Sequence, residues 1–332
     1  MRAWILVALL ACSSANCLAG DRVPVFLDTD IGSDVDDVLA LLTILATPEL
    51  ELVGISTVHG ESGARARIAR RLLELAGRPD IRVGAGIGTT LLRRKQPRDW
   101  SRELRQHLDA EPRTPVSSEH GVDLMIQAAR RHPGLKVLAI GPLTNVAVAI
   151  LKDPELPKRI GQLMVVGGAT HFPPVTERGT IFVDYKSEYN LNCDPDAAAL
   201  VFESGVPILM SGLAPALEVT VEKRHLEEWR RLGTPVASWT VARVEERLAR
   251  HASHETHLGD VLGCVLAHTP ELAQVQKLPV SIEMWGQTLR TVIDPTGSGR
   301  AVDVVMTVHR EKFMKHFLES MNRILSAERP AR

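Results

Sequence analysis

Five aspartates stand within ten consecutive positions near the start of the chain: Asp28, Asp30, Asp34, Asp36 and Asp37. The chain has 40 acidic residues in 332, so ten positions would hold 40 × 10/332, or about one. Carboxylates this close repel one another, and some must stay protonated unless a cation lies among them. Carboxylate oxygens without neighbouring cysteine thiolates suit a hard ion such as Ca²⁺ or Mg²⁺ better than Zn²⁺. The cluster therefore predicts a metal site.

Three other interpretations of the cluster require different residues around the aspartates. A solvated acidic turn that caps a helix is ordinary for one or two aspartates but a poor account of five. An EF-hand loop follows a helix and carries Glu at its twelfth position, whereas a strand precedes Asp28 and the twelfth position is Leu39. A metal-dependent phosphohydrolase of the haloacid-dehalogenase type also begins with a strand and Asp-x-Asp. Its further metal-binding acids lie much later in the chain, and no clear phosphate-holding Lys follows here, so it stands as the alternative.

The elements that would position the aspartates alternate between strand and helix. The apolar run 23–27 predicts a strand that ends at Asp28, and the pattern at 38–46 predicts the next helix. Alternation at this pitch indicates right-handed βαβ units and an α/β fold, with a Rossmann-like open, mostly parallel sheet and helices on both faces. Ligands bind such sheets at the carboxyl ends of the strands, where the aspartates lie. Further strands are expected at 52–58, 81–83, 135–140, 162–166, 207–210, 279–284, 288–293 and 302–308, and further helices at 64–76, 122–131, 143–151, 195–203, 222–231, 236–251, 259–267 and 311–325.

The composition is that of an ordinary globular protein, with 45% hydrophobic and 24% charged residues. The net charge of −1 argues against nucleic acid or an anionic membrane surface as the main partner. Arg-rich stretches at 65–71 and 93–105 are expected on the surface, where they would offset an acidic pocket. Without a repeat or a Ser/Gly linker, residues 20–332 are expected to form a single domain. Within it, 84–120 is expected to be irregular, and the chain after Pro215 could form a helical lobe over the sheet.

Residues 1–19 have the features of a secretory signal peptide. Arg2 precedes a short apolar run, and small residues lead to a cleavage site after Ala19. The run is well short of the roughly 20 residues that cross a bilayer, so no transmembrane segment is expected. Residues 9–12 resemble a bacterial lipobox, which would make Cys12 a lipid-anchored N-terminus. The sequence thus predicts an exported protein, periplasmic or extracellular, with lipid anchoring left open.

Five motifs, in order, resemble those of the inosine–uridine-type nucleoside hydrolases. The first strand of that family ends in Asp-x-Asp-Pro-Gly-x-Asp-Asp; here Ile31 replaces Pro, and two extra residues separate Gly32 from the paired aspartates, a form that looks like a bacterial branch. The other similar stretches are residues 139–145, 165–168, 188–198 and 259–262. The resemblance spans about 23–306. It implies the nucleoside hydrolase fold and cleavage of the N-glycosidic bond of ribonucleosides to free base and ribose.

The resemblance also implies roles for individual residues. A Ca²⁺ would be held by three carboxylates and one backbone carbonyl, those of Asp30, Asp37, Asp260 and Ile140. Asp30 would serve as the base for the attacking water. The contacts to the ribose would come from Asp36, Glu188 and Asn190. The two-residue insertion leaves open whether Asp34 replaces Asp36 or Asp37, and Asp28 is expected behind the metal ligands. An anionic site of this kind stabilises the positive charge that builds on the sugar when the bond breaks.

Two departures from the family pattern concern the leaving base and the orientation of the substrate. Many members carry His directly before the last metal Asp, where this chain has Gly259. Of three histidines just upstream, His257 is the one that could reach the base. Glu61 stands where the family has Asn after the second strand, and at that position it is expected to bind the substrate. Aromatic residues between 168 and 190, Tyr189 among them, could stack on a base. These departures keep open a protein that binds nucleosides or ribose without catalysis. The family also suggests a homo-oligomer and needs no organic cofactor.

Overall fold

The computed structural model describes residues 22–169, 188–250, 255–285, 288–293, 297 and 299–327. The predicted signal peptide, the lipobox at Cys12 and most of the loop between 168 and 190 lie outside the described residues. Within them, no helix is long and apolar enough to cross a membrane. Cys193 and Cys264 are both free thiols.

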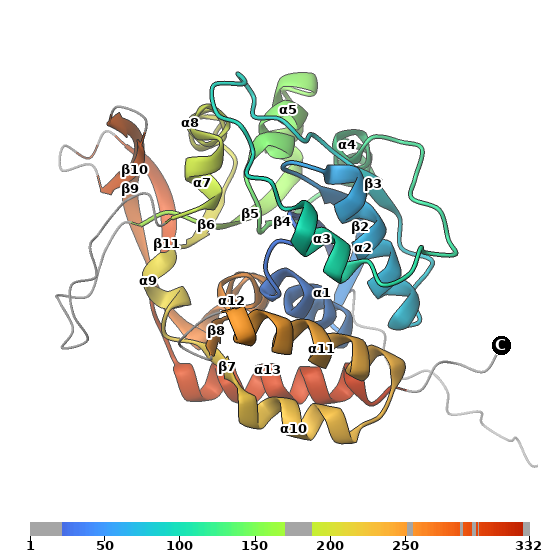
Figure 1. Ribbon diagram of the computed structural model, residues 1–332. Helices are drawn as coiled ribbons and strands as arrows, with labels where there is room; N and C mark the ends of the chain where they lie inside the picture. Colours follow the sequence, from blue (N-terminus) through green and yellow to red (C-terminus); the bar gives the residue numbers. More distant parts are fainter. Residues whose placement is uncertain are drawn as a thin grey trace, which may run out of the picture.

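A nine-stranded sheet forms the centre of the molecule (Figure 1). Its strand order is β10-β9-β11-β6-β5-β4-β1-β2-β3. All neighbouring strands pair in parallel except β9, which runs antiparallel to β10 and β11. The strands are β1 (Val23–Thr29), β2 (Leu50–Thr57), β3 (Val83–Ala85), β4 (Leu135–Ala139), β5 (Ile160–Val166), β6 (Ile208–Ser211), β9 (Ala273–Trp285), β10 (Thr288–Ile293) and β11 (Arg300–Val308). The predicted open, mostly parallel sheet is confirmed.

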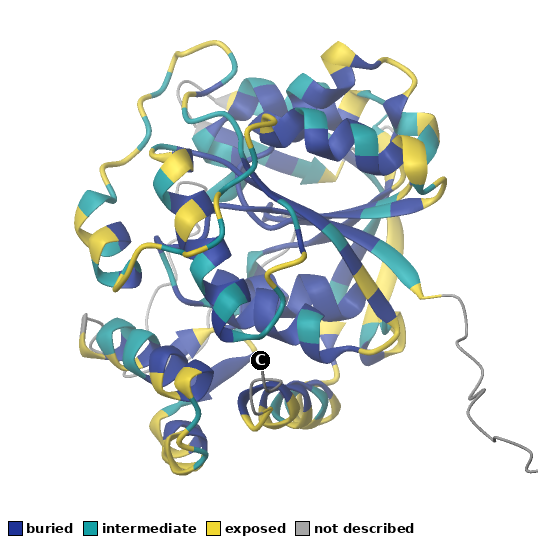
Figure 2. Ribbon diagram, turned by 90° about the vertical axis from the view of Figure 1, so that its right-hand side faces the viewer, coloured by how far each residue is buried: buried dark blue, intermediate teal, exposed yellow. Residues whose placement is uncertain are grey.

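Helices cover both faces of this sheet, because successive side chains of each strand point to opposite sides. In β1, Val25 and Leu27 belong to one hydrophobic cluster and Phe26 to the other. On the Phe26 side lie α4 (Gly121–Arg131), α5 (Thr144–Lys152) and α8 (Pro195–Glu203); on the other lie α1 (Asp36–Ala46), α2 (Ser62–Leu75), α12 (Gly259–Leu266) and α13 (Arg310–Leu325). The strands are buried along most of their length, and exposed residues gather on the outer faces of the helices (Figure 2).

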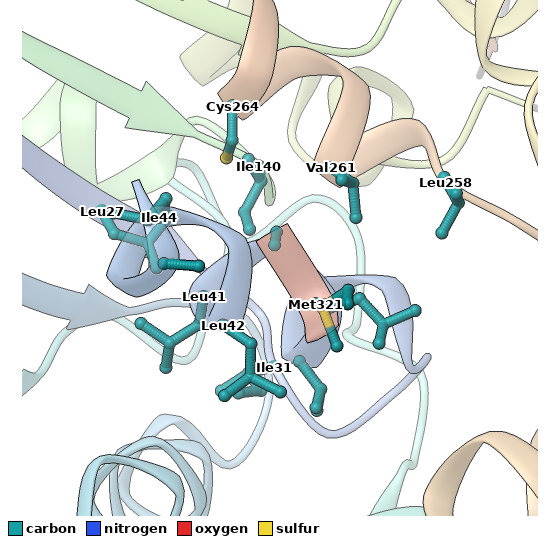
Figure 3. Packing of buried hydrophobic residues seen from close by; sticks show 14 of the residues in the cluster. Leu27, Ile31, Leu41, Leu42, Ile44, Ile140, Leu258, Val261, Cys264 and Met321 are labelled. Atoms are coloured by element: carbon teal, nitrogen blue, oxygen red, sulfur yellow. The ribbon is translucent and has the colours of Figure 1, made fainter. Parts of the chain in front are cut away.

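Helix α1 is buried on nearly every face, since the sheet, α12 and α13 all pack against it. Figure 3 shows Leu41, Leu42 and Ile44 of α1 in the same buried cluster as Met321 of α13. A helix enclosed in this way is apolar all round, as the sequence of α1 is after its first two residues. The packing fixes the N-terminus of α1, which carries Asp36 and Asp37.

The chain after β6 adds further helices on the α1 side of the sheet, at the place where the sequence left a helical lobe open. It contains α9 (Leu213–Ala216), α10 (Lys223–Arg231), α11 (Pro235–Arg250) and a small antiparallel pair of β7 (Thr220–Glu222) and β8 (Glu255–His257). Figure 1 shows α10 and α11 near α13, below α1 and α12. The other short elements are α3 (Ser101–His107), α6 (Leu156–Arg159), α7 (Asn190–Cys193) and a 3₁₀ turn at Pro270–Leu272.

Most predicted elements agree with the structure to within a few residues, with three corrections. The stretch 84–120 is not irregular throughout, because α3 forms within it and buries Leu104 against the core. Strand β9 begins at Ala273, six residues before the predicted start, because its ladder with β11 extends that far. The stretch 65–71 is not all surface: Arg65 is 0% and Arg70 3% exposed.

Candidate active site

The carboxyl ends of four neighbouring strands border one cavity of about 670 Å³. The wall includes a residue just beyond each of these strands: Asp30, Ile140, Gly167 and Gly212. The loop after β1 and the first turn of α1 add Ser33, Asp34, Asp36 and Asp37, and the first turn of α12 adds Asp260. The expected placement of the acidic cluster at this edge of the sheet is therefore observed.

Three of the wall carboxylates converge. Asp36, Asp37 and Asp260 each offer an oxygen, and these oxygens lie within 4.8 Å of one another. Burial, reinforced by the charge of Asp34, raises the pKa of Asp36 to about 8. Burial and the neighbouring aspartates hold the pKa values of Asp37 and Asp260 well above their usual range. Two buried carboxylates and one half-buried one, all with such a preference for the neutral form, suit a bound cation, and the all-oxygen donor set fits a hard ion.

Asp30 lies beside this trio, on the loop that leaves β1. Its Oδ2 accepts a hydrogen bond of 3.2 Å from Ser33 Oγ. The buried guanidinium of Arg65 donates through Nη1 to the backbone carbonyls of Asp30 and Ile31 and to Ser33 Oγ. Arg65 Nε donates to the carbonyl of His59 over 2.7 Å, so one side chain ties together the loops after β1 and β2. The conformation of Asp30 is thus set by a buried cation of the chain itself.

The turn between Asp30 and α1 depends on two residues. Gly32 has φ +102°, and a Cβ there would lie 2.7 Å from the side chains of Ile68 and Leu104. Only glycine fits both the backbone conformation and the space. Ile31 is completely buried in the core beneath the loop. It replaces the family's Pro with an apolar anchor.

Glu188, Asn190 and Ile140 meet at another part of the cavity. Asn190 Nδ2 donates 3.0 Å hydrogen bonds to the carbonyls of Ile140 and Val166. Glu188 accepts from the backbone N–H of Leu191, and burial raises the pKa of Glu188 to about 7. The predicted carbonyl ligand at Ile140 and two predicted ribose contacts therefore share one wall.

Asp28 lies behind these groups, as expected. Its Oδ1 accepts from Asn145 Nδ2 at 2.7 Å and from Ser56 Oγ, and burial raises the pKa of Asp28 to about 7. Asp34 takes a different direction from the trio, because its carboxylate pairs with Arg247 of α11, 2.6 Å from Nε. The structure therefore places Asp36 and Asp37, rather than Asp34, next to Asp260.

A family model described as inosine-uridine preferring nucleoside hydrolase matches residues 25–315. The chain belongs to this family. It is therefore an enzyme that cleaves the N-glycosidic bond of nucleosides.

Two nucleoside hydrolases and one uncharacterized protein resemble the chain over nearly its whole length. The pyrimidine-specific ribonucleoside hydrolase RihA of Salmonella schwarzengrund is 28% identical over 316 residues, which cover 90% of this chain and 98% of RihA. An uncharacterized protein of Schizosaccharomyces pombe is 31% identical over 90% of this chain and 99% of its own. The structure of the plant nucleoside hydrolase PpNRh1 superposes with a TM-score of 0.79 at 26% identity and covers 92% of this chain and 99% of its own.

The residues that depart from the nucleoside hydrolase pattern have distinct places. Glu61 is exposed, precedes the first residue of α2 and is not among the residues that line the cavity. His257, the last residue of β8, is exposed and lines the cavity. Gly259 also lines it, and a Cβ there would lie 3.3 Å from the Cβ of Ala216, within a tight junction of α12 and α9. His251 and His254 lie outside the described residues.

Sequence reasoning missed three side chains of this nucleoside hydrolase site: Arg65, Trp100 and Arg247. Trp100 Nε1 donates to the hydroxyl of Tyr189 at 3.0 Å, and that hydroxyl lies 3.1 Å from Nε2 of the buried His59. A tryptophan in a polar stretch of a chain with only 4% aromatics was a signal for Trp100. No such signal marked Arg65 or Arg247, because arginine on an amphipathic helix normally faces solvent.

Proposed function

We propose that this nucleoside hydrolase is an exported, Ca²⁺-dependent enzyme that releases free base and ribose from ribonucleosides. The observation that carries the proposal is the convergence of Asp36, Asp37 and Asp260 beside Asp30, in one cavity with Glu188 and Asn190. A small-molecule nucleoside matches the cavity's size and polarity.

In the arrangement that the family resemblance implies, the ion would be held by Asp37, Asp260 and Asp30 with the carbonyl of Ile140. Asp36, the most exposed member of the converged trio, would face the ribose. When bound, Ca²⁺ orients the sugar hydroxyls and lowers the pKa of the attacking water. The choice of Ca²⁺ rests on the resemblance to the nucleoside hydrolases, and the all-oxygen donor set, which includes a backbone carbonyl, is compatible with it.

The chain's own residues supply the remaining chemistry. The water oxygen bonds to C1′ and one of its protons passes to Asp30. The C1′–N bond breaks and its electron pair leaves with the base, which then gains a proton. Asp36, Glu188 and Asn190 hold the ribose hydroxyls, and His257 on the cavity rim is the proposed proton donor to the base. Glu61, exposed and off the cavity wall, is left out of this set.

A panel of nucleosides tests the activity. The purified mature chain, supplied with Ca²⁺, should convert at least one of inosine, adenosine, uridine and cytidine to base and ribose. It should also hydrolyse a nitrophenyl riboside, whose leaving group needs no protonation. Binding of nucleosides in calorimetry without turnover of any substrate would instead identify a non-catalytic binding protein. Phosphate release from a nucleotide with its glycosidic bond intact would favour the dehalogenase-type alternative, for which family membership gives no support.

Export and assembly are proposed from the sequence alone. Expression of the full chain with its first 19 residues should give a periplasmic or secreted product whose N-terminus is Gly20, or a lipidated Cys12 if the lipobox is used. Recovery of the intact N-terminus in the cytoplasm would contradict export. Light scattering of the mature protein should show a homo-oligomer, and a monomeric mass would overturn that part of the proposal.

A further inference from the structure

The proposed function assigns one part of the cavity to the sugar, and the remaining wall must face the base. The carboxylate end consists of Asp30, Asp36, Asp37 and Asp260 together with Glu188 and Asn190. The base wall includes Arg98, Trp100, Glu103, Leu213, Leu217 and Arg247. It combines apolar surface from α9 and its C-terminal flank, one aromatic ring, one carboxylate from α3 and two guanidinium groups. Since the ribose occupies the carboxylate end, an attached base extends along the base wall.

Arg247 is fixed within this wall. Its Nε donates to Asp34 Oδ1 at 2.6 Å, and the same Asp34 oxygen accepts from the backbone N–H of Val35 at 2.7 Å. Of the Arg247 side chain 14% remains exposed, and the residue lines the cavity. Its Nη1 is enclosed and has no hydrogen-bond partner among the described residues. Asp34 therefore holds the guanidinium through Nε, while Nη1 has no acceptor among the described residues and part of the side chain remains exposed at the cavity wall.

The chemistry of the reaction gives such a group a task. When the C1′–N bond breaks, the electron pair places negative charge on the nitrogens and carbonyl oxygens of the base. A guanidinium stays positively charged at every relevant pH and donates hydrogen bonds to acceptors of this kind. A donor held in place before the reaction stabilises charge that develops in the transition state without reorganising. Asp34 supplies that preorganisation for Arg247.

We propose that Arg247 binds the acceptor atoms of the leaving base and stabilises the negative charge that develops on it. The interaction is a charged hydrogen bond, and no proton leaves Arg247; the base gains its proton from His257 or water. This assignment rests on the proposed hydrolase activity and explains how a chain with Gly259 in place of the family's histidine still activates a leaving group. The substrates it favours are nucleosides whose base carries a carbonyl oxygen or ring-nitrogen acceptor.

The competing account is that the Arg247–Asp34 ion pair only holds the loop after β1 in shape. The two accounts differ in how the loss of Arg247 depends on the leaving group. A charge stabiliser is needed for a poor leaving group and not for nitrophenolate, which is stable as an anion. If the ion pair only holds the loop in shape, its loss should lower the rate equally for every substrate, because the loop carries residues of the carboxylate end.

The experiment compares Arg247→Met with wild type on inosine, uridine and nitrophenyl riboside in saturating Ca²⁺. We expect kcat/KM on a natural nucleoside to fall on the order of 10²–10³-fold, the usual cost of one preorganised donor. Turnover of the nitrophenyl riboside should change less than about threefold and also reports that the variant is folded. Across substituted phenyl ribosides, the rate should depend more steeply on leaving-group pKa in Arg247→Met.

Two further variants keep the outcome decisive. Arg243→Met removes an arginine from the same helix that bonds to Glu246 and is not among the cavity-lining residues, so its substrate ratio should equal that of wild type. Arg247→Lys retains the charge and should recover part of the loss, and it replaces Arg247→Met if the latter does not fold. Equal losses of kcat/KM on all substrates would overturn the proposal and show that the ion pair only holds the loop in shape. No turnover of any substrate by wild type would instead refute the hydrolase activity itself.

Discussion

The two ends of the cavity are formed by different kinds of structural element. The carboxylate end comes from strand ends and from the first turns of α1 and α12, and Asp30, Asp37, Glu188 and Asp260 are each less than a tenth exposed. The base wall comes from the stretch 84–120, from α9 and its flank, and from α11. Its Arg98 is exposed, and its Trp100 is half-buried beneath the Arg98 guanidinium, 4.2 Å from the ring centroid.

This difference separates two kinds of function. Side chains fixed by the sheet and by buried helix ends act on every substrate, because every nucleoside presents the same ribose. Side chains carried by loops and lobe helices tolerate change, and they meet the part of the substrate that varies. We therefore expect changes at the carboxylate end to alter kcat for all substrates, and changes at the base wall to alter the choice among them.

The largest effect is expected from Asp30→Asn. Removing the proposed base should lower kcat by roughly 10²–10⁴-fold, the range associated with general-base catalysis. The loss should be equal on inosine and on nitrophenyl riboside, since deprotonation of water is common to both. Steady-state kinetics in saturating Ca²⁺ measure it.

Asp80→Asn is the matched control for that experiment. Asp80 is an exposed carboxylate paired with Arg78, so the variant makes the same change in charge away from the cavity and should retain wild-type kcat. If Asp30→Asn kept more than a tenth of the wild-type rate, Asp30 would not be the base. A loss of rate confined to inosine would contradict the expectation that changes at the carboxylate end affect all substrates.

The second effect concerns the ion and Asp260. A ligand that binds only the folded state stabilises it by RT ln(1 + [L]/Kd), about 2.7 kcal/mol at a hundredfold excess over Kd. Ca²⁺ should therefore raise the unfolding temperature of wild type, and a chelator should reverse the rise. Asp260→Asn should remove most of this shift, because it takes one oxygen charge from the converged trio. Differential scanning calorimetry gives the measurement, and an equal shift in Asp260→Asn would exclude Asp260 as a ligand.

The third effect is the pH dependence contributed by Glu188. Burial raises the pKa of Glu188 from 4.5 to about 7 in the folded protein, so between these values the folded state binds more protons than the unfolded state. The contribution of Glu188 to the free energy of unfolding must then fall as pH rises from 4.5 to 7 and level off above that. The fall amounts to about 1.4 kcal/mol for each unit of pKa difference.

Glu188→Gln isolates this contribution from the other buried carboxylates. Urea unfolding of both proteins in saturating Ca²⁺, from pH 4.5 to 8, gives the difference in stability, wild type minus variant. That difference should decrease with pH across the window. A difference that grows with pH would mean that Glu188 is stabilised as the carboxylate.

The sequence predicted one end of the cavity far better than the other, for a physical reason. A ring of carboxylates is visible as a local excess of one residue type, and the strand before it places it at a known edge of the sheet. The alternation of strands and helices gave the layers and most element boundaries in the same way. Trp100 and Arg247 reach the cavity only through the tertiary path of the stretch 84–120 and of α11, which no local pattern encodes. Arg65 was predicted at the surface, but it is buried. Its burial depends on carbonyl partners from two other loops, which the local sequence does not reveal.

The smallest effect is expected where the two ends meet, at Tyr189. Its hydroxyl accepts from Trp100 Nε1 on the base wall and lies next to His59, whose carbonyl Arg65 binds. Tyr189→Phe keeps the ring and removes one hydrogen-bonded hydroxyl, a change worth about 0.5–1.5 kcal/mol. KM for natural nucleosides should therefore rise only about threefold, at nearly constant kcat. Trp100→Phe should have a similar effect, and the double variant should cost less than the sum, since both changes remove the same bond. Strict additivity would show that the Trp100–Tyr189 bond does not connect the base wall to the carboxylate end.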